Sequence, residues 1–183
     1  MSLINTTPDG FVDARYAIAD AEFHEFAHGL LAETKTVALG RNTFELFQNV
    51  WPPILEKENM PESQVRMARV LNDKDKTVFS STLRTTLWNN STIVEKIDAE
   101  YINAYKQEDR KGLLTIGSPG LVASLTAMKL IDDYYFSVQP HIAGTGESRL
   151  FEKIKLDATH RLKYMDSKQL RSGVHIIHYQ TVA

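Results

Sequence analysis

The stretch Leu113-Leu114-Thr115-Ile116-Gly117-Ser118-Pro119-Gly120 decides the fold class of this chain. Four β-prone residues lead directly into a turn with two glycines, and a helical pattern then continues to about Leu130. Ser118 suits the N-cap of that helix, and Pro119 suits its first position, where the missing proline N–H costs nothing. The stretch therefore predicts a buried strand that turns straight into a helix, as in a parallel α/β sheet.

Strands and helices alternate on both sides of this unit. We expect strands over 3–7, 36–39, 76–79, 93–94 and 133–138. Helices are expected over 21–32, after a capping Asp20, in a short element after Thr43 that Trp51-Pro52-Pro53 breaks, over 61–71 and over 99–106. Strands over 161–165 and 174–181 form a C-terminal hairpin. The pattern predicts an α/β fold in one domain, 1–183, with a mixed, mostly parallel sheet and an antiparallel C-terminal hairpin.

Composition excludes several classes of function. The 183 residues include no cysteine, which rules out disulfides, cysteine-ligated zinc, iron–sulfur clusters and a thiol nucleophile. With 21 Lys+Arg against 23 Asp+Glu, the net charge of −2 argues against a nucleic-acid binder. No apolar run approaches the roughly 20 residues of a membrane span, and the N-terminus has no signal-peptide layout. We therefore expect a cytoplasmic protein that acts on a small molecule, without nucleic acid or membrane partners.

Three predicted strand ends carry groups that suit a phosphate-bearing ligand. Gly40-Arg41-Asn42-Thr43 and Gly117-Ser118-Pro119-Gly120 each place open backbone at a helix N-terminus, where N–H groups and the helix dipole favour anions. Ser80-Ser81-Thr82 adds hydroxyl donors. Each piece alone is more often a turn or a cap, and neither glycine run matches G-x-G-x-x-G or the P-loop. Their combination is more specific, because ligands bind at the carboxyl ends of parallel strands.

Motifs along nearly the whole chain carry a resemblance to a known family. In order they are Asp9-Gly10-Phe11-Val12, the runs 37–45, 76–83, 116–121 and 130–134, Pro140-His141-Ile142-Ala143-Gly144-Thr145-Gly146, and Leu150-Phe151. Together they resemble the dihydrofolate-reductase-like fold, a three-layer α/β/α architecture. Within it, they are most similar to the family of the C-terminal reductase domain of the bifunctional riboflavin-biosynthesis deaminase-reductase.

The resemblance implies an NADPH-dependent reductase of a small heterocycle, pyrimidine- or pterin-like. Such an enzyme would be similar to 5-amino-6-(5-phosphoribosylamino)uracil reductase or to dihydrofolate reductase. The residues implied at the adenosine ribose phosphate are Gly40, Arg41, Asn42, Thr43, Ser80, Ser81 and Thr82. Those implied at the pyrophosphate are Gly117, Ser118, Pro119, Gly120 and Leu121. Family members pair, so the resemblance also implies a homodimer.

The substrate side of the resemblance is less complete. Asp9 resembles the acid that faces the substrate, and a carboxyl in a partly apolar cleft can have a raised pKa and donate a proton. Alternatively, Asp9 only shapes a Pro-Asp-Gly turn. Trp51, Gly144 and Gly146 are expected to wall the substrate, although Trp51 also fits a core aromatic. The riboflavin enzymes commonly carry Glu at the position of Ile116, and the zinc deaminase half has no counterpart here.

Two alternatives to a reductase stay open. The first is a dinucleotide-binding module that has lost catalysis, which the apolar Ile116 favours. The second is a zinc metallopeptidase, because His24-Glu25-Phe26-Ala27-His28 matches H-E-x-x-H. The context of that motif is poor, since both histidines fall at the margin of an apolar helix face and Gly29 follows directly. We therefore expect no metal site.

Overall fold

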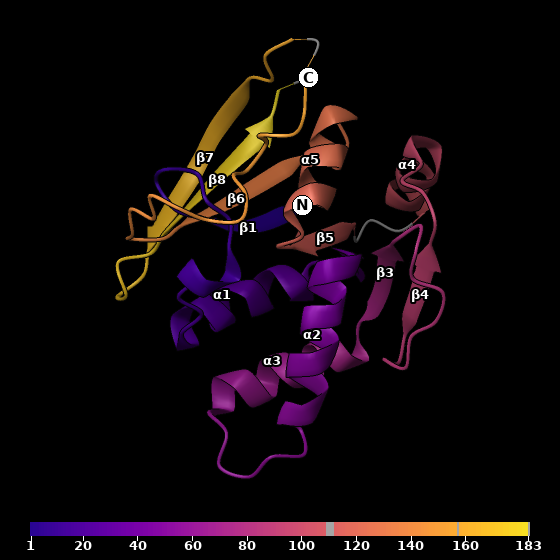
Figure 1. The fold of residues 1–183 in the computed structure, drawn as a ribbon, viewed down its shortest axis with the longest axis vertical. Coiled ribbons are helices and arrows are strands. Elements are labelled where there is room, and N and C mark those ends of the chain that lie inside the picture. Colours follow the sequence, from indigo (N-terminus) through magenta and orange to yellow (C-terminus); the bar gives the residue numbers. More distant parts are fainter. Residues whose placement is uncertain (109–111, 157, 183) are drawn as a thin grey trace.

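An eight-stranded sheet forms the centre of the computed structural model, which describes residues 1–108, 112–156 and 158–182 (Figure 1). Its strands are β1 (Ser2–Thr6), β2 (Thr36–Gly40), β3 (Asp75–Phe79), β4 (Ser91–Val94), β5 (Leu113–Ile116), β6 (Asp133–Val138), β7 (Leu162–Gln169) and β8 (His175–Thr181). The strand order is β4-β3-β2-β5-β1-β6-β8-β7. Neighbours from β4 to β6 are parallel, whereas β8 pairs antiparallel with β6 and β7. The predicted mixed, mostly parallel sheet is confirmed.

Helices cover both faces of this sheet. They are α1 (Ala21–Ala32), α2 (Arg41–Ile54), α3 (Glu62–Asp73), α4 (Ala99–Glu108) and α5 (Pro119–Ala127), with a short 3-10 turn, η1 (Ala14–Tyr16). Side chains alternate along each strand, so Leu3 packs into the layer of α1, α2 and α3, whereas Ile4 packs into the layer of α4 and α5. The three-layer α/β/α architecture is therefore confirmed. None of the helices in the described part of the chain combines the length and apolar character needed to cross a membrane.

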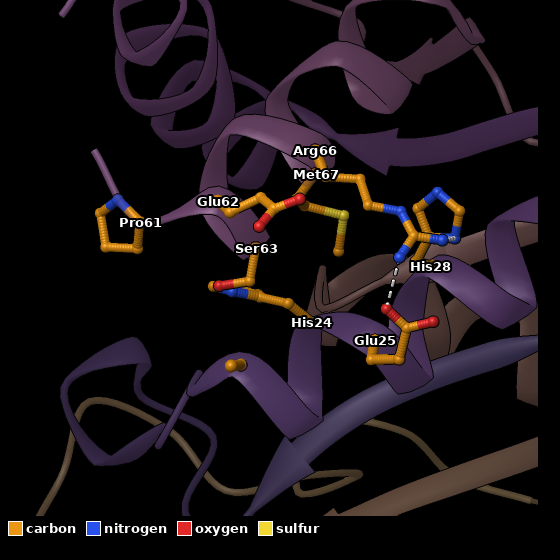
Figure 2. Close-up of a pocket in the computed structure, with 9 residues that line it drawn as sticks. His24, Glu25, His28, Pro61, Glu62, Ser63, Arg66 and Met67 are labelled. Atoms are coloured by element: carbon orange, nitrogen blue, oxygen red, sulfur yellow. Dashed lines mark hydrogen bonds and ion pairs between the residues drawn. The ribbon is translucent and has the colours of Figure 1, made fainter. Parts of the chain in front are cut away.

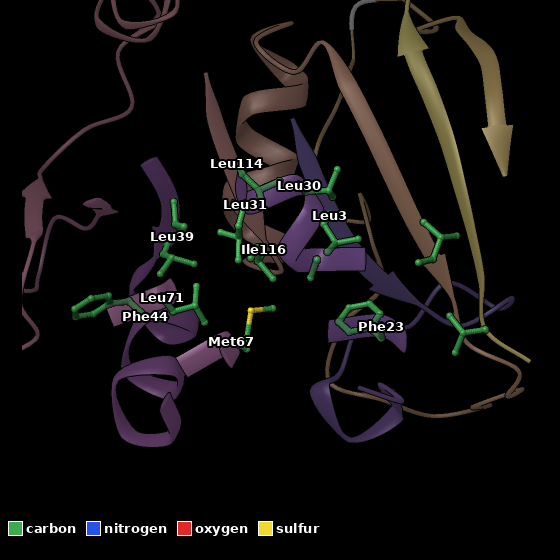
Figure 3. Packing of buried hydrophobic residues seen from close by; sticks show 14 of the residues in the cluster. Leu3, Phe23, Leu30, Leu31, Leu39, Phe44, Met67, Leu71, Leu114 and Ile116 are labelled. Atoms are coloured by element: carbon green, nitrogen blue, oxygen red, sulfur yellow. The ribbon is translucent and has the colours of Figure 1, made fainter. Parts of the chain in front are cut away.

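The larger core lies between the sheet and the first helix layer. Figure 3 shows Phe23 of α1 and Met67 of α3 directed toward Leu3 and Ile116 of the sheet. Asp20 fixes the start of α1, because its carboxylate accepts the N–H of Phe23 over 2.9 Å. The core therefore holds α1, α2 and α3 against one face of the parallel strands.

Two helix ends differ from the sequence-based expectation. The expected break at Trp51-Pro52-Pro53 is wrong, because α2 continues through both prolines to the buried Ile54. The fixed φ of proline is helical. The two missing N–H donors and the contacts of the rings with the preceding turn affect only the last turn of the helix. Helix α5 ends at Ala127 instead of about Leu130, since Lys129 turns left-handed with φ 57° and Leu130 N donates to Leu125 O over 2.9 Å. This is a Schellman C-cap.

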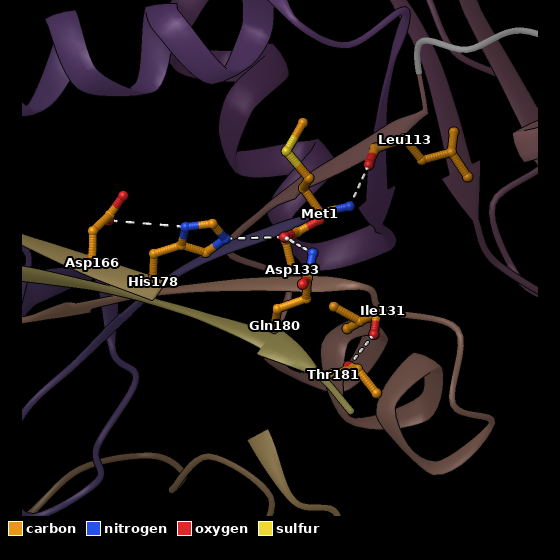
Figure 4. A network of polar contacts seen from close by, with 8 residues as sticks. All are labelled: Met1, Leu113, Ile131, Asp133, Asp166, His178, Gln180 and Thr181. Carbon is orange, nitrogen blue, oxygen red and sulfur yellow. Dashed lines mark hydrogen bonds and ion pairs between the residues drawn. The ribbon is translucent and has the colours of Figure 1, made fainter. Parts of the chain in front are cut away.

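Polar contacts attach the C-terminal hairpin to the parallel part of the sheet. His178 Nε2 of β8 lies 3.0 Å from Asp133 Oδ1 of β6, and Gln180 Nε2 donates to the same oxygen over 3.4 Å (Figure 4). Asp166 of β7 lies 3.9 Å from the other ring nitrogen of His178. The predicted hairpin is confirmed, with a first strand that extends to Gln169 rather than to Met165.

Candidate active site

Three predicted ligand-binding segments meet at one edge of the sheet. Strands β3, β2 and β5 are adjacent and parallel, so their carboxyl ends lie side by side. The N–H of Gly40, at the end of β2, donates to Ser118 Oγ after β5 over 2.9 Å. On its other side, Arg41 Nη1 donates to Thr82 Oγ1 after β3 over 3.0 Å. The structure therefore brings these segments together at the start of α2.

The N-termini of α2 and α5 open onto this junction without side-chain caps. Gly40 has no side chain to offer at the N-cap of α2. Ser118 occupies the N-cap position of α5, but its hydroxyl binds Gly40 and makes no cap hydrogen bond, so the expected capping is wrong. Pro119 does take the first helical position, as predicted. Unpaired N–H groups and two dipole ends give this junction the electrostatics of an anion site.

Backbone conformation explains the glycine at position 117, whereas position 40 has room for an added Cβ in ordinary van der Waals contact. Gly117 has φ 66°, in the left-handed region that side chains disfavour. A Cβ on Gly40 would touch Ser118 Oγ at 3.7 Å and Leu121 Cβ at 3.8 Å, so α5 packs closely on β2 here. Gly120 lies in open space at the first turn of α5, and Asn42 is exposed at the first turn of α2.

The hydroxyls after β3 have different surroundings. Ser80 is buried, and its Oγ accepts the N–H groups of Thr82 over 3.2 Å and Leu83 over 2.9 Å. That hydroxyl therefore holds the turn. Ser81 and Thr82 are exposed beside the Arg41 guanidinium, where an incoming phosphate would find both hydroxyls and the charge.

An apolar cavity of about 260 Å³ lies next to this junction. Ile4 and Asn5 of β1, Ile116 at the end of β5, the turn at Gly117, and faces of α1 and α2 line it. Trp51 is part of its wall and also packs against Phe47 of the core, with ring centroids 6.1 Å apart. Its contact with a substrate stays a prediction. Among the described residues, no Asp, Glu, Lys or Arg lines this cavity.

Asp9 lies in a turn away from that cavity. Gly10 N donates to Thr7 O over 2.9 Å, which confirms the predicted turn. The Asp9 carboxylate accepts the N–H groups of Ala143 over 3.1 Å and Gly144 over 2.8 Å. The Thr7 hydroxyl and these N–H groups lower the pKa of Asp9 to about 2. The expected raised pKa is therefore wrong, because hydrogen bonds to the charged carboxylate outweigh its partial burial.

The expected substrate contacts Gly144 and Gly146 belong to the same loop. Asp13 accepts the N–H of Glu147 over 2.9 Å, so two carboxylates hold this loop. A Cβ on Gly146 would lie only 2.4 Å from Phe11 Cδ1, which explains the glycine by packing. Neither glycine lines the apolar cavity, and contact with a substrate stays a prediction for both.

The H-E-x-x-H motif lines a separate shallow pocket between α1 and α3 (Figure 2). Arg66 of α3 reaches into it, with Nη1 2.7 Å from Glu25 Oε2 and Nη2 3.3 Å from His28 Nδ1. A guanidinium there competes with any cation. Among the described residues, no group of three His, Cys, Asp or Glu side chains could hold a metal ion. This geometry disfavours the peptidase interpretation.

His24 was expected at the margin of the apolar face of α1 and outside any site, but it is buried on that face. It is 5% exposed and lines the apolar cavity as well as the shallow pocket. Burial lowers its pKa. The sequence signal that could have marked His24 as a candidate is its position beside Phe23 on the predicted apolar face of this helix. A polar residue on such a face needs a hydrogen-bond partner or has a function.

Comparisons with known proteins place this architecture among solved structures. A putative riboflavin biosynthesis protein from Shewanella sp. PV-4 matches all of this chain and 98% of its own chain, with a TM-score of 0.70 and 17% identity. A pyrimidine reductase-like protein from Corynebacterium diphtheriae matches all of this chain and 91% of its own, with a TM-score of 0.69 and 14% identity. RibD from Acinetobacter baumannii has a TM-score of 0.64 and 12% identity, and this chain spans 57% of its length.

The chain belongs to the RibD C-terminal domain family, whose model matches residues 4–176. This family is a reductase family of riboflavin biosynthesis, which supports a reductase-like role for the chain. A relative in sequence is the uncharacterized protein YyaP of Bacillus subtilis, 26% identical over 175 residues that cover 92% of this chain and 87% of YyaP.

Proposed function

We propose that this chain is an NADPH-dependent reductase that transfers a hydride to a small heterocyclic substrate, pyrimidine- or pterin-like. One observation carries the proposal: the Gly40–Ser118 and Arg41–Thr82 hydrogen bonds join three strand ends beside an apolar cavity. A junction suited to anions beside an apolar cavity is what a nicotinamide dinucleotide and its substrate would require, and this supports the proposal.

The residues at the junction fit the phosphates of NADPH. The Arg41 guanidinium with the Ser81 and Thr82 hydroxyls would hold the 2′-phosphate through charge-assisted hydrogen bonds. The turn from Gly117 into α5 would hold the pyrophosphate, because its left-handed glycine leaves the uncapped N–H groups of the helix open. When bound, NADPH supplies the hydride.

The chain's own contribution to the reaction is to position and desolvate the substrate. Phe47, Trp51 and Ile116 exclude water from the cavity, and the tight β5–α5 turn fixes its border with the junction. Holding two reactants in one geometry removes much of the entropic barrier to transfer. Because no carboxylate of the described residues lines the cavity, the side chains there act by orientation and hydrogen bonding.

The experiment that tests this proposal is turnover of NADPH with candidate substrates. Purified protein is incubated with NADPH and dihydrofolate, a dihydropterin or 5-amino-6-(5-phosphoribosylamino)uracil, and loss of NADPH absorbance is followed. Oxidation that depends on one of these heterocycles supports a reductase. Failure of the protein to bind NADPH at physiological concentration would refute the proposal.

A dinucleotide-binding module without catalysis is the second candidate. It is favoured by Ile116 at the cavity and by the Asp9 carboxylate, which is bonded to a loop outside it. This candidate predicts tight NADPH binding and no oxidation with any heterocycle, so binding and turnover measured on the same preparation separate the two functions.

We further propose that the protein is a cytoplasmic homodimer. The resemblance to paired family members supports this, and β7 is an edge strand whose Tyr164 and Met165 are 57% and 40% exposed. An exposed edge strand with apolar side chains is a ready surface for pairing. Light scattering at micromolar concentration measures the mass, and a monomer would contradict this part of the proposal.

A further inference from the structure

Two buried polar atoms at the apolar cavity have no hydrogen-bond partner among the described residues. They are Nδ1 of His24 and the indole Nε1 of Trp51. Buried polar groups in folded proteins are nearly always hydrogen-bonded, because an unpaired one has lost its bonds to water without replacement. A pair of such atoms at one cavity therefore marks a place where a ligand completes the hydrogen bonding.

The two side chains form a corner between two helices. His24 comes from the first turn of α1 and Trp51 from the end of α2. Their ring centroids lie 5.8 Å apart with an interplanar angle of 76°, an edge-to-face contact. Both residues line the cavity. Phe23, which also lines it, contacts the His24 ring with a centroid distance of 6.4 Å, and Phe47 contacts the Trp51 ring with a centroid distance of 6.1 Å. These ring contacts restrict the positions of both side chains.

The charge of the cavity restricts what these atoms can bind. With no Asp, Glu, Lys or Arg among the described lining residues, a phosphate or a cation at the His24–Trp51 corner, away from the Gly117 turn, would be buried without a counter-charge, which is strongly unfavourable. The Trp51 indole only donates. Burial lowers the pKa of His24, so its imidazole is neutral at neutral pH, with one donor and one acceptor nitrogen.

We infer that His24 and Trp51 are the polar recognition pair for a neutral, unphosphorylated planar ring that carries a carbonyl acceptor. The inference rests on the proposed function, whose substrate class it narrows. Trp51 donates its N–H to the ring carbonyl, and His24 bonds to a polar ring atom nearby. The apolar walls cover the faces of the ring. Cyclic diones of the pyrimidine or pteridine type have this chemistry, whereas phosphoribosylated rings do not.

The two tryptophans of the chain provide a direct test. In a ¹H–¹⁵N spectrum of the full chain saturated with NADPH, the indole N–H groups of Trp51 and Trp88 give separate signals. Trp88 Nε1 donates to Asn72 Oδ1 over 3.2 Å and serves as the internal control. Lumazine, a neutral pteridine dione, should shift the Trp51 signal and leave the Trp88 signal in place. Uridine 5′-monophosphate, with its charged phosphate, should bind at least about tenfold more weakly.

Variants then assign the contacts. Trp51→Phe and His24→Phe should each weaken lumazine binding about tenfold, as expected for one lost hydrogen bond to a buried group. His28→Phe, the same substitution one turn along α1 and outside the cavity, should leave it unchanged. Removing an unpartnered polar atom from a buried site favours folding, so the melting temperatures of the two cavity variants should not fall. Unchanged lumazine affinity in both cavity variants would overturn the inference.

The remaining outcomes separate this inference from the proposed function. Two results would overturn the role of His24 and Trp51 as a recognition pair, even if the protein binds NADPH. One is that uridine monophosphate binds as tightly as lumazine, and the other is that lumazine leaves the Trp51 signal unchanged. Lumazine binding that shifts Trp51 in a protein without affinity for NADPH supports the pair and refutes the reductase.

Discussion

The backbone N–H of Gly40 donates to the Ser118 hydroxyl over 2.9 Å, and this bond links the ends of β2 and β5 across 78 residues of sequence. Ser118 makes it from a left-handed backbone conformation, with φ 57°. Because the hydroxyl is turned toward β2, it leaves the first N–H groups of α5 uncapped. One side chain thus holds two strand ends together and keeps the helix N-terminus open for a ligand.

Ser118→Ala should weaken both the fold and the binding of NADPH. Loss of a partly buried hydrogen bond costs about 1 kcal/mol of unfolding free energy, measured by urea titration. A looser β5–α5 turn should also reduce NADPH affinity about threefold to tenfold, measured by nicotinamide fluorescence. Ser124→Ala is the matched control, because that hydroxyl bonds to Gly120 O within α5 itself. Equal NADPH affinity in the Ser118 variant and the wild type would contradict the role of this bond.

Arg41→Ala should reduce affinity for NADPH more than for NADH. The guanidinium lies 3.0 Å from Thr82 Oγ1 and 3.8 Å from Glu45, so it is held where a 2′-phosphate would meet the hydroxyls. A charge-assisted contact of this kind is worth about 1.5–3 kcal/mol, or roughly tenfold or more in Kd. Arg161→Ala, before β7 at the other side of the sheet, is the control. Equal losses for the two coenzymes would show that Arg41 does not contact the 2′-phosphate.

Local sequence signals predicted most of the fold, because each element carries its own start and stop. Asp20 caps α1, Pro119 begins α5, and the alternation of Leu3 and Ile4 sends side chains into two layers. The meeting of the Gly40, Ser80 and Gly117 segments was expected because each follows the carboxyl end of a parallel strand. Local sequence signals failed where a contact with a residue distant in sequence determines the role of a side chain. Ser118 reads as an N-cap, but its hydroxyl binds Gly40 on another strand.

The substrate side was less predictable for the same physical reason. The carboxylate of Asp9 could have faced a cleft. Instead its pKa is lowered by the nearby Thr7 hydroxyl and by the N–H groups of Gly144 and Ala143, which come from a loop more than 130 residues away. His24 sits in a strong metal motif, yet its neighbours are Trp51 and Phe23 rather than two further ligands. Periodicity places such residues on a buried face without revealing what they meet there.

Asp9→Asn should lower stability at neutral pH and lose its effect in acid. The pKa of Asp9 is about 2 in the folded chain against an ordinary value of 3.8, so the charged carboxylate favours folding above pH 4. That contribution is lost as the pH falls from about 4 through the folded pKa of about 2, and it is gone only below that pKa, where Asp9 is protonated in the folded and unfolded chains alike. Urea midpoints of the two proteins should therefore differ at pH 6 and approach each other as the pH falls through about 2.

The control for this comparison is Glu152→Gln, an exposed carboxylate without a hydrogen bond or ion pair to the described residues, which should change no midpoint. A difference between wild type and the Asp9 variant that grows toward low pH would contradict the hydrogen-bonded loop anchor.

Gly146→Ala should destabilise the fold, whereas Gly29→Ala should stabilise it. The new methyl at Gly146 would lie 2.4 Å from Phe11 Cδ1 and 2.6 Å from Asp13 Oδ2, an overpacking that costs about 1–3 kcal/mol. Gly29 lies within α1 with no atom within 4 Å of an added Cβ, so alanine there should gain up to about 1 kcal/mol. The melting temperatures of both variants check these predictions. A change of the same sign and size in the two variants would contradict the close packing at Gly146.

The junction of Gly40, Arg41, Thr82 and Ser118 should bind the phosphates of NADPH. The measurement that checks this is a titration of the purified chain with NADPH and with NADH, followed by nicotinamide fluorescence. We expect saturable NADPH binding with a Kd between about 1 μM and 1 mM, the usual range for enzyme ligands, and weaker binding of NADH. Absence of saturable NADPH binding at millimolar concentration would contradict it.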